Sequence, residues 1–253
     1  MTASEPPLPF EIPTDDGVLP GLLWAPVGPS RPRPGVVVLQ EIFGLSPYIR
    51  QRCADLAALG MVVLAPQLFA RLDPPVSDVP DGEDFEAWLG RGMACASALP
   101  WERAEADAVA ALAALRALPQ VDEGRVALLG FCYGGGLAFS AAATASARGD
   151  APAALVSFYG SALPTLLDRA ALVDLPSLHL FGTADAFIPI ETVQKIRAAV
   201  TAEGSRPQVR FELFEGAGHA FDNPHPGLHH AEAAERAWAL TESFLRTQLR
   251  RSS

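Results

Sequence analysis

One short segment of the sequence carries the residue best suited to covalent chemistry. Residues 126–136 read VALLGFCYGGG, and within them Gly130 and Gly134 flank Cys132 in the pattern G-x-Nuc-x-G. This pattern is typical of a nucleophile on a sharp turn between a strand and a helix, where a Cβ two residues before or after it would clash with backbone. The N-terminus of such a helix favours thiolate over thiol and makes the N–H of Tyr133 a candidate oxyanion donor.

Cys132 has an alternative interpretation, because a free cysteine is often a small buried core residue. The surrounding sequence favours the nucleophile. Residues 125–130 (RVALLG) predict a buried strand and the alanine-rich residues 134–147 predict a helix. This is the strand–turn–helix context that the pattern requires.

Two later segments supply candidate partners for the cysteine. Asp185 follows the strand-like residues 178–181, and His219 lies in a glycine-rich loop after the strand-like residues 209–213. The order nucleophile, acid, histidine is that of the α/β-hydrolase triad. His219 would take the Cys132 proton and later assist attack by water, while Asp185 would hold the imidazole tautomer.

Other acids and histidines compete for these roles. Asp168 and Asp174 precede the strand and so belong at the wrong end of the sheet, and His179 lies inside a strand pattern, where a core role is expected. Residues 225–230 (HPGLHH) contain a histidine pair, His225 and His229, at metal-ligand spacing, followed by His230. No third ligand stands at a recognised position, so we expect neither a metal site nor a cofactor.

The elements that must position these residues alternate along the chain. Residues 8–12 and 19–24 flank a hairpin turn at residues 15–17, and proline-rich loops follow at 27–34 and 67–81. Further strands are predicted at 35–40, 61–65, 125–130, 153–158, 178–181 and 209–213, and helices at 47–59, 84–98, 101–118, 134–147, 189–202 and 228–249. This alternation predicts a single α/β domain over residues 1–253 with a mainly parallel sheet, helices on both faces, and ligands at the carboxyl ends of its strands.

Composition excludes several other classes of protein. Hydrophobic residues make up 49% and charged residues 19% of the 253 residues, as in a globular protein. The formal net charge of -10 disfavours binding to nucleic acid or to anionic membranes. Three cysteines without CxxC spacing, an N-terminus unlike a signal peptide and no apolar run of about 18 residues predict a cytoplasmic protein. A monomer and a homodimer are not distinguished.

Together these motifs resemble the dienelactone hydrolase (carboxymethylenebutenolidase) family within the α/β-hydrolase superfamily. The resemblance covers the chain from about Gly35 onward, and it rests on QEIFG at 40–44, APQLF at 65–69, GFCYGG at 130–135, GTAD at 182–185 and GAGHAF at 216–221. It implies that Glu41 lies beside the resting cysteine and influences its thiol/thiolate state. It also implies that the N–H of Ile42 is the second oxyanion donor.

The chain departs from the family where a substrate carboxylate would be held. Members that act on a carboxylate-bearing lactone use two arginines; the position of one reads Asn223 here, and Arg91 is a loose match for the other. We therefore expect a cysteine-dependent hydrolase of small esters or lactones, with Asn223 and Arg91 as substrate-binding candidates. The alternatives are a broader carboxylesterase or thioesterase, and a non-catalytic member that only binds a ligand.

Overall fold

The computed structural model describes residues 6–26, 31–80 and 84–250, which belong to two compact units, Met1–Val126 and Ala127–Ser253. The division falls within β5 (Val121–Phe131). One domain over residues 1–253 stays a prediction. Parts of the predicted loops at 27–34 and 67–81, and the start of the N-terminal segment, lie outside the described residues.

The first unit is built on four neighbouring strands in the order β1-β2-β4-β3, which are β1 (Leu8–Thr14), β2 (Gly17–Trp24), β3 (Arg33–Leu39) and β4 (Val62–Pro66). The predicted hairpin is confirmed, since β1 and β2 pair antiparallel across residues 15 and 16. β2 also pairs antiparallel with β4, and β4 pairs parallel with β3. All of β4 and the last five residues of β3 are buried, as expected of valine-rich strands covered on both faces.

The helices that accompany these strands are α1 (Pro47–Ala58), the 3-10 helix η1 (Leu68–Arg71), α2 (Phe85–Ala98) and α3 (Trp101–Arg116). α1 begins at Pro47, where a missing N–H costs nothing, and the Ser46 hydroxyl accepts a hydrogen bond from the N–H of Ile49. α1 packs on β4, and α3 packs on β1, β3 and β4. The helix η1 falls inside the predicted loop 67–81.

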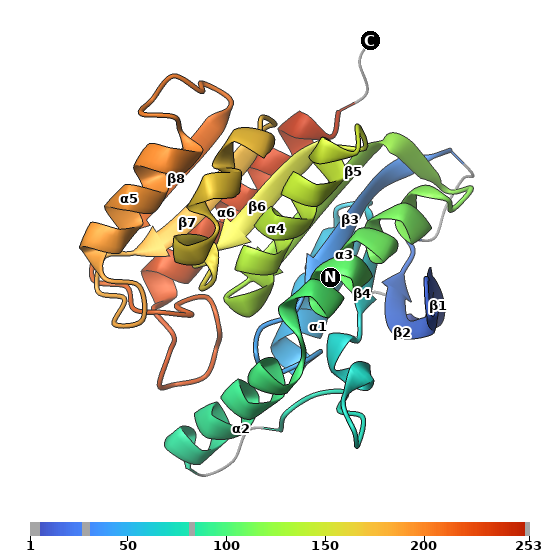
Figure 1. The fold of residues 1–253 in the computed structure, drawn as a ribbon, viewed down its shortest axis with the longest axis horizontal. Coiled ribbons are helices and arrows are strands. Elements are labelled where there is room, and N and C mark those ends of the chain that lie inside the picture. The colour runs from blue at the N-terminus through green and yellow to red at the C-terminus, as the bar shows by residue number, and fades with distance from the viewer. Residues whose placement is uncertain (1–5, 27–30, 81–83, 251–253) are drawn as a thin grey trace. The chain divides into compact units, whose positions relative to one another are not determined.

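The second unit continues with parallel strands in the order β5-β6-β7-β8, where the new strands are β6 (Ala154–Phe158), β7 (Ser177–Gly182) and β8 (Val209–Phe214). Its helices are α4 (Tyr133–Ala147), η2 (Leu163–Thr165), η3 (Leu167–Leu172), α5 (Ile190–Val200) and α6 (Ala231–Gln248). In Figure 1, α4 lies in front of the strands and α6 behind them. The predicted helices on both faces are thus found in this unit.

The strand register of this unit brings three loops to one edge. Phe131, the last residue of β5, pairs with Phe158, the last of β6, and Gly182 at the end of β7 pairs with Phe214 at the end of β8. Because the strands are parallel, the residues that follow them emerge on the same side. The candidate nucleophile, acid and histidine all come from these loops.

The α/β class and the mainly parallel strands predicted from the sequence are confirmed. The 3-10 helices η2 and η3 were not expected, and α6 begins at Ala231 rather than at residue 228. The later start has a local cause: the side chain of His230 caps the helix by accepting from the N–H of Ala233. None of the helices in the described parts of the chain is long and apolar enough to cross a bilayer.

Candidate active site

Cys132 lies on a strained turn between β5 and α4. Its φ of 54° and ψ of -114° fall where a non-glycine residue is rarely found. The turn is held by its backbone, since the N–H of Cys132 donates to the Phe158 carbonyl (3.0 Å) and its carbonyl accepts from Gly135 (3.0 Å) and Ser161 (3.0 Å). A Cβ on Gly130 would lie 1.9 Å from the carbonyl oxygen of Gly134. The glycine requirement predicted for this turn is therefore confirmed at Gly130.

The helix that follows starts at the nucleophile itself. Tyr133 is the first residue of α4, so its N–H belongs to the first turn, where N–H groups point out of the helix end. The small residues after it let α4 approach β6 closely, because a Cβ on Gly135 would lie 2.6 Å from the Phe158 carbonyl oxygen. The positive end of the helix dipole thus lies beside the sulfur of Cys132.

Cys132, His219 and Asp185 form one continuous chain of contacts. The Nε2 of His219 lies 3.1 Å from the Sγ of Cys132, and its Nδ1 lies 2.7 Å from the Oδ2 of Asp185. Cys132 is 8% exposed, and the side chains of His219 and Asp185 are 9% and 0% exposed. The three residues singled out from the sequence therefore meet within hydrogen-bonding distance.

Asp185 is fixed in place by its own loop. Its Oδ1 accepts from the N–H groups of Phe187 (2.8 Å) and Ile188 (2.9 Å), which leaves Oδ2 for the imidazole. The acid and histidine loops are also joined by backbone, since the N–H of Ala184 donates to the Ala217 carbonyl (2.9 Å). The orientation of the imidazole is therefore set from both loops.

The charge of His219 is governed by its partners. Burial alone lowers the pKa of an imidazole, but here the negative charge of Cys132 and the hydrogen bonds to Asp185 and Cys132 outweigh it and raise the pKa of His219 to about 10. The raised pKa favours the protonated form of the imidazole between Cys132 and Asp185.

Two aromatic rings that the sequence did not single out contact this imidazole. The Tyr159 ring lies 5.3 Å from the His219 ring and the Phe187 ring lies 5.2 Å from it, centroid to centroid. Tyr159 follows β6 directly and has a φ of 37°, and Phe187 stands two residues after Asp185. For Tyr159 the available signal was an aromatic residue directly after a strand. Neither ring contact could be predicted, because both depend on tertiary packing.

The two candidates for substrate binding have other contacts. Asn223 is 4% exposed, and its Oδ1 accepts from the N–H of His225 (3.0 Å), so its amide holds the turn that follows the histidine loop. Arg91 is an exposed residue of α2, and its Nη2 donates to the Pro80 carbonyl (3.2 Å). Their role in binding substrate stays a prediction.

Glu41 and Ile42 belong to the first unit, in the loop after β3. Both are buried, at 1% and 7% exposure. The loop turns at Gly44, whose φ is +74°, and a Cβ there would lie 2.6 Å from the Ser77 carbonyl oxygen. Only glycine fits this conformation and this close approach. The roles of Glu41 and Ile42 toward Cys132 stay predictions.

The competing residues are placed elsewhere. His179 is fully buried in β7, as expected of a core histidine, and its Nε2 lies 3.2 Å from the Ser177 hydroxyl. Asp168 lies in η3, and Asp174 bonds to Gln208 near the amino ends of β7 and β8. Within residues 6–26, 31–80 and 84–250, no three His, Cys, Asp or Glu side chains are arranged to hold a metal ion.

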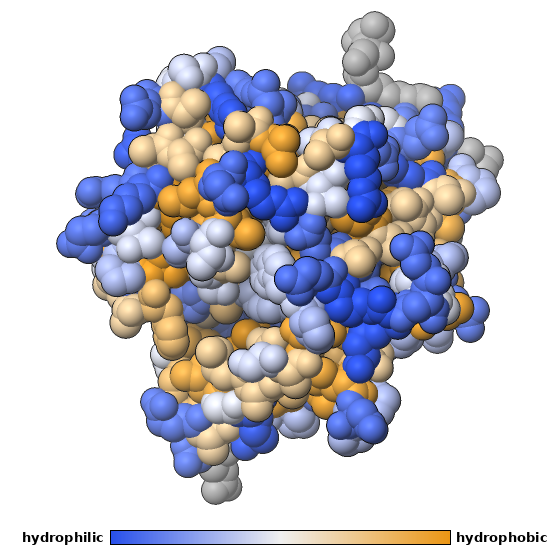
Figure 2. Space-filling model, viewed as in Figure 1, coloured by the Kyte–Doolittle hydropathy of each residue, from blue (hydrophilic) through white to orange (hydrophobic). Residues whose placement is uncertain are grey.

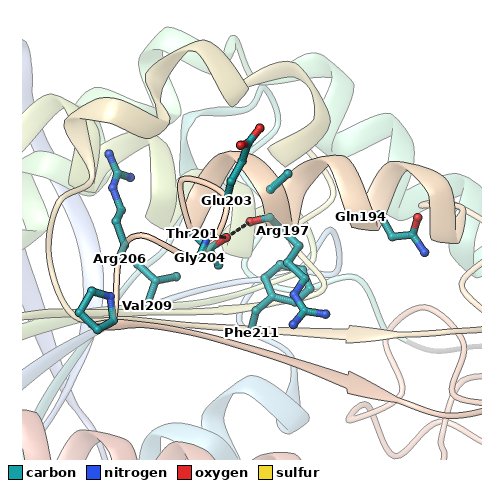
Figure 3. A pocket seen from close by; sticks show the side chains of 10 residues that line it. Gln194, Arg197, Thr201, Glu203, Gly204, Arg206, Val209 and Phe211 are labelled. Carbon is teal, nitrogen blue, oxygen red and sulfur yellow. Dashed lines mark hydrogen bonds between the residues drawn. The ribbon is translucent and has the colours of Figure 1, made fainter.

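A surface hollow of the second unit is separate from these residues. Figure 3 shows this pocket, which lies between the carboxyl end of α5 and the amino end of β8. Its volume is about 460 Å³. Arg197, Thr201 and Phe211 are among its lining residues, and none of Cys132, Asp185 and His219 lines it. Its place at the amino end of β8 sets it apart from the loops at the carboxyl ends.

The parallel strands, the strained turn after β5 and the loops after β7 and β8 define an α/β-hydrolase fold. A family model described as the dienelactone hydrolase family matches residues 19–249, and the chain belongs to this family. It is therefore a hydrolase of that family, and the resemblance seen in the sequence is confirmed.

Related proteins agree with this assignment. The chain is 34% identical over 219 residues to a carboxymethylenebutenolidase of Pseudomonas sp. strain P51, covering 86% of this chain and 87% of that protein. It is 31% identical to a carboxymethylenebutenolidase of Pseudomonas putida, covering 85% and 86%. The solved structure of a promiscuous dienelactone hydrolase-like phosphotriesterase from metagenomic libraries superposes with a TM-score of 0.72 at 28% identity, covering 97% of this chain and 99% of that one.

Proposed function

We propose that this protein hydrolyses small esters or lactones through an acyl-enzyme on Cys132. The observation that carries the proposal is the contact chain from the Sγ of Cys132 through His219 to Asp185, at 3.1 and 2.7 Å. These are the distances and the order of groups that an activated nucleophile requires. Family membership supports the same reaction class.

The first half-reaction forms the acyl-enzyme. The Cys132 thiolate bonds to the substrate carbonyl carbon, and the carbonyl electron pair moves onto oxygen, toward the N–H of Tyr133. The family resemblance implies the N–H of Ile42 as the second donor. When the carbonyl re-forms, the bond to the leaving oxygen breaks and that oxygen takes the proton from the Nε2 of His219. The products are a thioester on Cys132, a neutral imidazole and an alcohol, or the free hydroxyl end of an opened lactone.

The second half-reaction uses the same histidine as a base. Once Cys132 is acylated its negative charge is gone, and that charge is the largest of the influences that raise the pKa of His219. The pKa of the imidazole therefore falls, and it takes a proton from water as the water attacks the thioester. Expulsion of the thiolate releases the carboxylic acid and restores the ion pair. Glu41 would influence the thiolate of the resting enzyme, as the family resemblance implies.

The proposal favours neutral substrates. A buried carboxylate needs a paired cation, and Asn223 offers a neutral amide where the family pattern has arginine. Another arginine, Arg71, is already paired, with its Nε and Nη2 at 3.0 and 2.8 Å from the carboxylate of Asp107.

A cytoplasmic location stays a prediction, supported by three cysteines that are all free thiols.

The direct test is replacement of the nucleophile. Cys132→Ala should lower kcat/KM for small esters by about 10⁴ or more, because the residue supplies the bond-forming atom. The thermal unfolding midpoint should change little, since only a small side chain is lost. Cys95→Ala, which removes a thiol on α2, is the matched control and should keep full activity. Normal turnover by folded Cys132→Ala would refute the mechanism.

A further inference from the structure

Phe187 stands out among the apolar residues of the second unit. It is 60% exposed, although most large hydrophobic side chains there are buried. Exposure alone carries no meaning, because single exposed hydrophobics are common. On the face in Figure 2, hydrophobic residues are likewise scattered among hydrophilic ones. What distinguishes Phe187 from Leu172, which is 43% exposed, is a ring contact with His219 at 5.2 Å.

The position of this ring is set by the loop rather than by the ring itself. The N–H of Phe187 donates to the Oδ1 of Asp185, and the next residue, Ile188, donates to the same oxygen and is 2% exposed. These bonds use backbone atoms, so they persist when the Phe187 side chain is changed. A substitution at this position therefore tests the ring without dismantling the acid loop.

Tyr159 provides the internal comparison. Its ring contacts the same imidazole at 5.3 Å, but it is fully buried and packs on Phe221 at 5.2 Å. Tyr159 is therefore a supporting residue within the protein. Phe187 has an apolar face that remains accessible beside the histidine.

We propose that Phe187 determines specificity by contacting the leaving alcohol of the substrate, and that the enzyme prefers esters whose leaving alcohol is apolar or aromatic. The inference rests on the proposed function, in which the Nε2 of His219 passes its proton to the leaving oxygen. The leaving group must then lie within reach of the imidazole, and the exposed ring beside it offers an apolar surface. An aromatic leaving group would bury that surface and gain a ring–ring contact.

The experiment uses three small esters and the full chain. Benzyl acetate and methyl acetate release alcohols of similar acidity, so they differ in leaving-group contact rather than in chemistry, and methyl phenylacetate places the ring on the acyl side. Phe187→Ala should lower kcat/KM for benzyl acetate about tenfold, as expected for loss of one aromatic contact and its buried area. The values for methyl acetate and methyl phenylacetate should change less than about twofold. Phe187→Leu should retain most of the preference.

Leu172→Ala is the matched control, because it removes an exposed apolar side chain in the same unit. It should leave kcat/KM for all three substrates unchanged. Equal losses for benzyl and methyl acetate would overturn the proposal and make Phe187 a positioning residue for His219. A loss confined to methyl phenylacetate, or no loss at all, would also overturn it. Failure of the proposed function is separate, since it would appear as benzyl acetate hydrolysis by Cys132→Ala.

Discussion

Two buried histidines of the second unit show opposite behaviour. His179 is fully buried in β7 among Phe139 and Phe211, and burial lowers its pKa to about 4. The side chain of His219 is 9% exposed, yet its pKa is raised to about 10. With similar burial, the pKa is thus lowered in one histidine and raised in the other.

The difference lies in the partners of each ring. His179 contacts the Ser177 hydroxyl and aromatic rings, which do not stabilise a positive charge enough to offset the loss of water. His219 lies between the sulfur of Cys132 and the carboxylate of Asp185, which do. In this protein the neighbours, rather than burial, separate a core histidine from one able to move protons.

The contrast between His179 and His219 would be refuted if both were equally important for turnover. We expect His219→Ala to lower kcat/KM by about 10⁴ or more, nearly as much as loss of Cys132, because the nucleophile loses its base. His179→Gln should keep kcat/KM within about tenfold, since it touches no reacting group. Steady-state kinetics on one neutral ester, with circular dichroism to confirm folding, measures both. A collapse of activity in folded His179→Gln would contradict this contrast.

The acid can be tested in the same assay. Asp185→Asn should lower kcat/KM somewhat less than His219→Ala does, because His219 remains but loses the carboxylate that orients it and stabilises its positive charge. Asp174→Asn is the matched control, since Asp174 bonds to Gln208 away from the imidazole. If Asp174→Asn cripples the enzyme and Asp185→Asn does not, the acid has been assigned wrongly.

The stability of the fold should report on His179. Its folded pKa of about 4 lies below the unfolded value of 6.5, so between these pH values the unfolded chain binds a proton that the folded chain does not. Stability is therefore lost as pH falls from about 6.5 to about 4, by about 3 kcal/mol from this residue alone. Urea unfolding at a series of pH values in this range gives the free energy of unfolding of wild type and His179→Leu, and this free energy should fall less steeply with decreasing pH in the variant. His229→Gln, a change at an exposed histidine, is the control and should show the wild-type pH dependence. The same pH dependence in all three proteins would refute the effect.

The smallest expected effect concerns selectivity at Asn223. A carboxylate-bearing ester should be cleaved less efficiently than its neutral counterpart, and Asn223→Arg should shift the ratio toward the acidic one by about 1.5–3 kcal/mol at most. The shift should be near the lower end, because the amide of Asn223 is buried and holds the His225 N–H. kcat/KM for the matched pair in both proteins, with Asn223→Gln as the neutral control, measures it. A wild-type preference for the acidic ester would show that a cation already serves it.

Local patterns predicted the parts of the molecule that are locally determined. The turn at Cys132 was predictable because the glycine spacing is itself the steric requirement, as the 1.9 Å approach at Gly130 shows. The acid and the histidine followed from their order after predicted strands. The start of α6 was misplaced because His230 looks like a helical residue in the sequence but acts as its cap.

Other features of the structure could not be predicted, because no short sequence pattern indicates them. The rings of Tyr159 and Phe187 reach His219 only through the packing of β6 and the acid loop. Arg71 pairs with Asp107, 36 residues away in the sequence. The 3-10 helices η2 and η3 are too short and too irregular for hydrophobic periodicity to indicate them.

The most direct test of the central claim is capture of the acyl-enzyme. Wild-type protein mixed with p-nitrophenyl butyrate and quenched in acid within the first turnover should carry one butyryl group, and peptide mass spectrometry should locate it on Cys132. Cys53 and Cys95 should stay unmodified, and the adduct should disappear as the substrate is exhausted. Steady release of product with no butyryl group on the Cys132 peptide, or with the group on another residue, would contradict the account.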